Sequence, residues 1–87
     1  MNIEITHNQD PLMGWDVSVK VAAEGTEKIA GVAVYVNMIR VVSVDFDPAL
    51  SVYTKEMERV GQFPGENVVQ VVVRDQNNVE TSGEDSW

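Results

Sequence analysis

The stretch from Gly65 to Asn78 constrains the fold more than any other part of this chain, because it reads as one long β-strand between two tight turns. Five of the six residues at positions 68–73 are valine, a β-branched residue that suits a pleated, packed surface better than a helix. Because side chains alternate along a strand, Val69, Val71 and Val73 are predicted to share one face. The opposite face then carries Val68, Gln70, Val72 and Arg74. A strand this apolar is expected inside a sheet, since a free edge would recruit other chains.

Six further segments have the composition of short strands. The clearest is 15–21, where one tryptophan and three valines alternate with polar residues. The others are 2–6, 29–37, 38–44, 53–60 and 79–87, and turn-forming residues separate them, with 45–48 expected to break the chain direction. A short helix is the alternative at 53–60, because Tyr53 and Met57 lie one helical turn apart. This spacing predicts an all-β, antiparallel sandwich of about seven strands, with 29–37 paired to 68–75.

Length and composition limit the class of protein. The 87 residues predict one domain, spanning 1–87, and the absence of cysteine excludes a disulfide or a thiolate metal site. No segment approaches the roughly 20 consecutive apolar residues of a membrane-spanning helix. Residues 1–7 lack the basic and apolar regions of a signal peptide. We therefore expect no membrane insertion, with a cytoplasmic location for a complete chain and a cell-surface location for a domain of a longer secreted protein.

The chain is acidic, with 14 aspartate and glutamate residues against 6 lysine and arginine residues and a net charge of −8. Direct binding to nucleic acid is not expected, because a phosphate backbone would be repelled at long range. The charges are spread along the chain, which is typical of a well-solvated surface. The alternative is an acidic inhibitor or nucleic-acid mimic that binds a basic partner surface.

Part of the sequence resembles a known family. The residues concerned are Pro64-Gly65-Glu66-Asn67, then Val69, Val71, Val73 and Asp75, and finally Asn77-Asn78. This series resembles the last hairpin of bacterial immunoglobulin-like domains, and 29–37 is similar to their central strand. Met38 and Asn77 stand where that family usually has glycine, and there is no cysteine pair or core tryptophan of antibody type. The resemblance implies an adhesive, spacer, protein-binding or carbohydrate-binding role in a bacterial or phage surface protein.

The residues that could take part in catalysis or bind a metal do not form a catalytic pattern in the sequence. His7, the only histidine, has no nucleophile or orienting carboxylate near it in the sequence and is expected on an edge strand. Asp45 with Asp47, and Asp75 with Asn77 and Asn78, are partial sets of calcium ligands that read more simply as solvated turns. Glu56 and Glu58 could imitate a glycosidase pair but are expected to face water. We predict no enzyme activity, no cofactor and no metal.

The predicted contact residues are apolar or aromatic. Tyr35, Val68 and Val72 are expected to form an apolar patch on the outer face of one sheet, although scattered apolar surface residues are common. Trp87 is a further candidate, because tryptophan is enriched at binding hot spots. Trp15 is expected in the core, and Phe63 is expected to close one end of it. The predicted partner is a protein or a carbohydrate surface, and a homodimer through an edge strand or the outer face is the other possibility.

Overall fold

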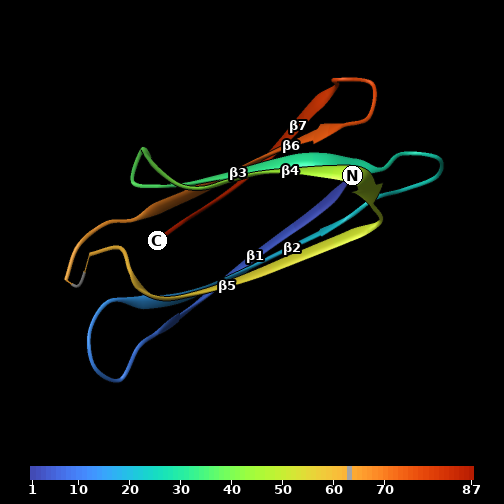
Figure 1. Ribbon diagram of the computed structural model, residues 1–87. Helices are drawn as coiled ribbons and strands as arrows, with labels where there is room; N and C mark the ends of the chain where they lie inside the picture. Colours follow the sequence, from blue (N-terminus) through green and yellow to red (C-terminus); the bar gives the residue numbers. More distant parts are fainter. Residues whose placement is uncertain (63) are drawn as a thin grey trace.

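The computed structural model describes residues 1–62 and 64–87, and the regular structure in them is β-strand (Figure 1). The strands are β1 (Asn2–Gln9), β2 (Trp15–Ala22), β3 (Ile29–Val36), β4 (Ile39–Leu50), β5 (Val52–Val60), β6 (Val68–Asp75) and β7 (Glu80–Ser86). They form two antiparallel sheets that face each other, so the predicted all-β sandwich is confirmed. Among the described residues there is no helix that could cross a membrane. The role predicted for Phe63 lies outside the described residues.

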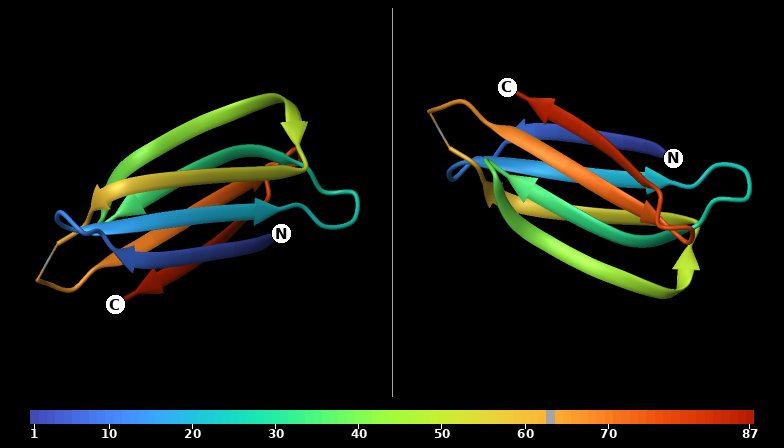
Figure 2. Two further views of the ribbon diagram at one scale, coloured as in Figure 1. Left: turned by 90° about the horizontal axis from the view of Figure 1, so that it is seen from below. Right: turned by 90° about the horizontal axis from the view of Figure 1, so that it is seen from above.

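The two sheets differ in size. The three-stranded sheet has the order β1-β2-β5, and the four-stranded sheet has the order β4-β3-β6-β7. Strand β6 therefore lies between β3 and β7, as a strand so rich in valine requires, and the predicted pairing of β3 with β6 is confirmed. The chain passes from one sheet to the other three times, between β2 and β3, between β4 and β5, and between β5 and β6. Figure 2 shows β4 along one margin of the molecule and β1 and β7 along the other.

Alternating valines form the core between the sheets. Every second residue of β6 is buried, and Val69, Val71 and Val73 are fully enclosed. Their counterparts are Val17, Val19, Val21, Ile29, Val32, Val34, Val36 and Met57. Burying a valine side chain contributes about 1.5–3 kcal/mol, so these residues supply the main favourable term in folding. The predicted orientation of β2, β3 and β6 is confirmed.

Residues 53–60 and the second half of β4 are both extended. Residues 53–60 form a strand rather than the alternative helix, because Met57 points into the core while its neighbours on either side are exposed. The prediction that 45–48 interrupts the chain is wrong, since β4 continues to Leu50. Phe46 packs against the core and against Tyr53, with 5.5 Å between ring centroids, and this contact holds the segment extended. Pro48 is tolerated because β4 is an edge strand, where a missing N–H leaves no ladder bond unmade.

A two-residue turn joins β3 to β4. Asn37 and Met38 both have positive φ, 50° and 71°, as the tight turns that match strand twist require. Asparagine adopts this conformation readily, which agrees with the predicted turn at Asn37. Methionine at the second position leaves its side chain 75% exposed. Met38 is thus held out at the end of the sandwich, beside the outer face of the four-stranded sheet.

Candidate functional site

The outer face of the four-stranded sheet carries the predicted contact patch. Strand register places Val72 between Ala33 of β3 and Ser82 of β7. The next row consists of Arg40, Tyr35, Gln70 and Glu84, one residue from each strand. Because residues directly opposite one another point to the same face, these side chains all project away from the core. The face therefore has an apolar and aromatic centre with charged residues at its margins.

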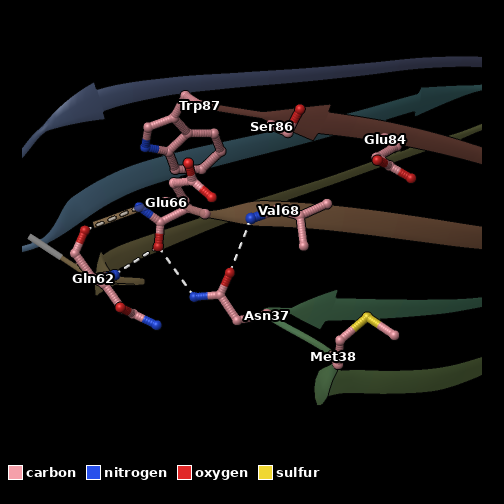
Figure 3. Close-up of a pocket in the computed structure, with 9 residues that line it drawn as sticks. Asn37, Met38, Gln62, Glu66, Val68, Glu84, Ser86 and Trp87 are labelled. Carbon is pink, nitrogen blue, oxygen red and sulfur yellow. Dashed lines mark hydrogen bonds between the residues drawn. The ribbon is translucent and has the colours of Figure 1, made fainter.

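Two adjoining hollows open on this face, and we call them together the outer-face groove. The larger, about 700 Å³, is lined by Asn37, Met38, Gln62, Glu66, Asn67, Val68, Glu84, Ser86 and Trp87 (Figure 3). The smaller, about 350 Å³, is lined by Tyr35, Met38, Gln70, Val72, Ser82, Gly83 and Glu84. Met38 and Glu84 line both, so the two hollows lie side by side. A space of this size accepts several side chains of an extended segment.

The structure brings the four predicted contact residues to this one groove. Tyr35 and Val72 line the smaller hollow, and Val68 and Trp87 line the larger one. All four are half-buried, so each has surface available to a partner. Trp15, which was predicted to lie in the core, packs against the core from its margin. It is half-buried, because it lies at the end of β2, where its indole N–H donates to the Gln62 carbonyl at 2.9 Å.

The groove is acidic. Glu66 and Glu84 line it, and no lysine or arginine of the described residues does so. Glu84 receives one long hydrogen bond, 3.5 Å from the Gln70 amide, and both carboxylates are exposed. Since the whole chain carries −8, the potential at this groove is negative. The groove therefore favours a cationic side chain next to an apolar one.

A buried asparagine builds the end of the larger hollow. Asn67 is 4% exposed. Its side-chain oxygen accepts hydrogen bonds from the backbone N–H of Gln62 at 2.6 Å and from the side-chain nitrogen of Asn37 at 3.1 Å. Its side-chain nitrogen donates to the Gln62 carbonyl at 2.9 Å. Asn37 in turn accepts from the Val68 amide at 2.9 Å. These bonds, drawn in Figure 3, tie the β3–β4 turn, the β5–β6 loop and the start of β6 together.

An aromatic cluster closes the sandwich behind the groove. The His7 ring stacks on Trp87, with centroids 4.0 Å apart and planes 8° apart, and the edge of Trp15 meets both rings. His7 Nδ1 lies 2.7 Å from an Asp85 carboxylate oxygen, which joins the edge strands β1 and β7 of the two sheets. The Trp87 indole nitrogen is buried and has no hydrogen-bond partner in the described part of the chain. The predicted edge position of His7 is confirmed.

Asp85 supplies the orienting carboxylate for His7 that the sequence did not reveal. Nucleophilic catalysis would also need a hydroxyl or thiol bonded to the free ring nitrogen. Nothing among the described residues forms such a bond, and Trp87 covers one face of the ring. The cluster is suited to holding β1 against β7, and it fixes Trp87 at the rim of the groove.

The other acidic candidates have structural partners or face water. Asp45 is paired with Arg74 at 2.8 Å, and Asp75 accepts the Asn77 and Val79 amides of the β6–β7 turn. In the described residues there is no group of three or more potential metal ligands. Glu56 and Glu58 are both exposed on β5. The calcium and glycosidase alternatives thus gain no support from the geometry.

Two carboxyls meet at the base of the β1–β2 loop. Asp10 is 6% exposed and accepts the Leu12 amide at 2.8 Å, which lowers the pKa of Asp10 below its ordinary value. The Asp10 carboxyl, in hydrogen-bond contact with Asp16, raises the pKa of Asp16. Because the pKa of Asp16 is higher in the folded than in the unfolded chain, protonated Asp16 stabilises the fold at low pH. This stabilisation is lost as the pH rises through the folded-state pKa. At neutral pH the ionised Asp16 beside Asp10 is therefore unfavourable.

Asp16→Asn is expected to stabilise the protein at pH 7. The amide keeps the shape of the side chain, carries no charge and can donate a hydrogen bond to Asp10. The gain should disappear well below pH ~4, where Asp16 of the natural chain is protonated. Chemical denaturation at both pH values measures the difference. Asp47→Asn, at an exposed position without an ion pair in the described residues, is the control and should change little. An equal gain from both variants would show that net charge alone is responsible.

Comparison with known proteins found no matching protein family, no matching curated protein and no matching solved structure.

The sequence predicted Tyr35, Val68, Val72 and Trp87 but not the other lining residues, among them Met38, Glu66 and Glu84. Glu84 could have been found by counting outward from the turn at Asn77, which sets Gln70 against Glu84. Met38 stands out in the sequence as a departure from glycine. The side chain of an exposed methionine is flexible and apolar, and such side chains are common at binding surfaces. Glu66 lies in a loop, and no pattern in the sequence predicts where its side chain points.

Proposed function

We propose that this chain is a non-catalytic binding module that holds a segment of a protein partner against the outer face of its four-stranded sheet. The observation that carries the proposal is the outer-face groove. Its apolar surface comes from Tyr35, Met38, Val68 and Val72, and its two charged residues have the same sign. Exposed apolar side chains that gather in a groove with a polar rim often mark an interaction site.

The opposite surface of the sandwich supports this choice by contrast. The outer face of the three-stranded sheet has a hollow of about 260 Å³, lined by Glu4, Thr6, Ser18, Val19, Lys20, Thr54 and Glu56. Its exposed side chains are polar and carry both signs of charge. Such a face is well solvated and offers little apolar area to a partner. The two outer faces thus differ in exposed apolar area, which is greater on the four-stranded sheet and favours contact with a partner there.

The chemistry of the groove also defines the partner. An extended segment with a lysine or arginine beside an apolar residue would satisfy both Glu66 and the Tyr35–Val72 surface. Ion pairs at an exposed rim contribute about 0.2–1 kcal/mol each, so the apolar contact must supply most of the affinity. We therefore propose binding that weakens only moderately in high salt.

The resemblance to bacterial immunoglobulin-like domains is part of the same proposal. It is supported by the sandwich architecture and by the role of Asn67, which explains why a Pro-Gly-x-Asn corner suits the start of β6. In a bacterial or phage surface protein, such a module would serve adhesion or spacing.

A displayed peptide library tests the proposal. The library is selected on the wild-type chain, and enriched peptides are titrated into wild type and into two matched variants. Val72→Asp places a charge on the smaller hollow, whereas Thr54→Asp places the same charge on the outer face of the three-stranded sheet. We expect peptides with basic and apolar residues, and at least about a tenfold loss of affinity for Val72→Asp, equivalent to ~1.4 kcal/mol. Thr54→Asp should bind as wild type.

Failure to enrich peptides that distinguish Val72→Asp from wild type would overturn the proposal. Selective binding of glycans on an array, with the same dependence on Val72, would keep the site but replace protein by carbohydrate as the partner class.

The acidic-mimic alternative makes a different prediction for the same reagents. If charge drives binding, Glu66→Gln with Glu84→Gln should abolish binding, and so should half-molar salt, where screening confines electrostatic attraction to a few ångströms. Val72→Asp would then have little effect. The relative sizes of these losses decide between the two functions.

A further inference from the structure

Strand β4 is a free edge with an unusual composition. It is the outermost strand of the four-stranded sheet, and of the described strands only β3 pairs with it. Ile39 and Val41 are 68% and 47% exposed, and Val42, Val44 and Phe46 are half-buried. A long strand with apolar side chains and unpaired backbone groups is a template for another strand.

The other sheet edges do not share this character. Strand β7 is acidic and polar, and the His7–Asp85 contact holds it against β1. Strand β5 presents Lys55, Glu56 and Glu58. Strand β4 lies at the opposite margin of the sandwich from β1 and β7 (Figure 2), and no described strand pairs with its outer edge.

The charges on β4 are complementary to themselves. Arg40 lies opposite Tyr35 and Asp45 opposite Gly31, so both project from the outer face. Beyond Asp45 the register with β3 shifts again, but Phe46 packs against the core and Asp47 is exposed, so Asp47 points away from the core as well. The register shift between Val34 and Tyr35 leaves Val41 as an extra residue. When this bulge is allowed for, Arg40 and Asp47 lie at equal distances on either side of Val44. An antiparallel strand with the same sequence would therefore place Arg40 opposite Asp47, while Asp45 would face Ser43 and keep its own partner, Arg74.

We infer that two copies of this chain pair through β4 about a twofold axis at Val44. In this register Val44 faces Val44 and Val42 faces Phe46 on the inner side, while Arg40 faces Asp47 of the second copy on the outer side. Directly opposite residues share a face, so both kinds of pair form together. Neither Arg40 nor Asp47 has an ion pair within the described residues, whereas Asp45 is held by Arg74.

The self-complementary pattern selects a second copy over a foreign strand. A twofold interface uses the same patch on both subunits, so one surface must carry both signs of charge at matched positions. A foreign basic segment would instead be repelled by Arg40. The net charge of −8 on each copy opposes association, so the dimer is expected to be weak and to form only at high concentration. This surface is separate from the outer-face groove, so the two proposals fail independently.

A charge-exchange experiment tests the dimer. Sedimentation velocity of the wild-type chain, up to millimolar concentration, should show a species of twice the 9.6 kDa monomer mass. Arg40→Asp and Asp47→Arg each place like charges opposite one another and should remain monomeric. An equimolar mixture of the two variants restores opposite charges at both positions and should dimerise again. Circular dichroism confirms that each variant is folded, and Val72→Asp should dimerise as wild type.

Three outcomes would overturn the inference. The first is a wild-type chain that stays monomeric at millimolar concentration. The second is a charge variant that dimerises as well as wild type, since the register would then be different. The third is a mixture that fails to associate although wild type does.

Discussion

Val71→Asp is expected to leave the chain unfolded, while Val72→Asp, one residue further along the same strand, folds normally. Val71 is fully enclosed between the sheets, and its opposite neighbours on β3 and β7 are Val34 and Gly83. A carboxylate there would be buried without a partner, at a penalty of several kcal/mol per ion. This is comparable to the whole stability of a small domain, about 5–15 kcal/mol. Val72 projects from the outer face, where a carboxylate remains hydrated.

Circular dichroism and proton–nitrogen NMR spectra of both variants measure this difference. Val71→Asp should lose the dispersed amide signals of a folded sheet, and Val72→Asp should keep them. Normal folding of both variants would mean that β6 is not a central strand. Loss of folding in both would mean that its outer face is packed, which would also remove the proposed contact surface.

Asn67→Ala is expected to lower the free energy of unfolding by about 2–4 kcal/mol, the second-largest effect that the structure implies. The variant removes the acceptor of the Gln62 amide and of the Asn37 side chain, and the donor to the Gln62 carbonyl. The site is 4% exposed, so water cannot fully replace these bonds. The larger hollow should also lose its shape, because Asn67 connects the segments that line it.

Urea denaturation measures the change, with Asn77→Ala as the matched control. Asn77 is exposed in the β6–β7 turn, and its side chain makes no hydrogen bond in the described part of the chain. The control should lose less than about 0.5 kcal/mol, as is usual for an exposed position. Equal losses from the two variants would contradict the role assigned to Asn67.

The parts of the fold that follow from alternation could be predicted from the sequence. The period of two in β2, β3 and β6 determines which side chains are buried, because a packed sandwich has one interior. The extent of β4 could not be predicted in this way. Asp-x-Asp-Pro is typical of a turn, but Phe46 packs against Tyr53 and Leu50 pairs with Ile29, and these contacts between separate segments leave no local pattern.

Some residues of the candidate site could be predicted from alternation within one strand, and others could not. Tyr35, Val68 and Val72 follow from the facing of their own strands. Glu84 and Met38 require the register between strands, which a single-strand pattern does not contain. The His7–Asp85 contact joins residues 78 positions apart on different sheets. Such a contact depends on how the sheets are placed, and no local signal in the sequence reports it.

Strand β6 has one face in the core and one face open to solvent, which is the face proposed to bind. Because the chain contains no cysteine, single cysteines can be introduced along β6 and their labelling rates in the native protein compared. We expect cysteine at 70, 72 and 74 to react rapidly, and cysteine at 69, 71 and 73 to react at least about a hundredfold more slowly, because labelling there requires the strand to open. Rates without this alternation would contradict the account.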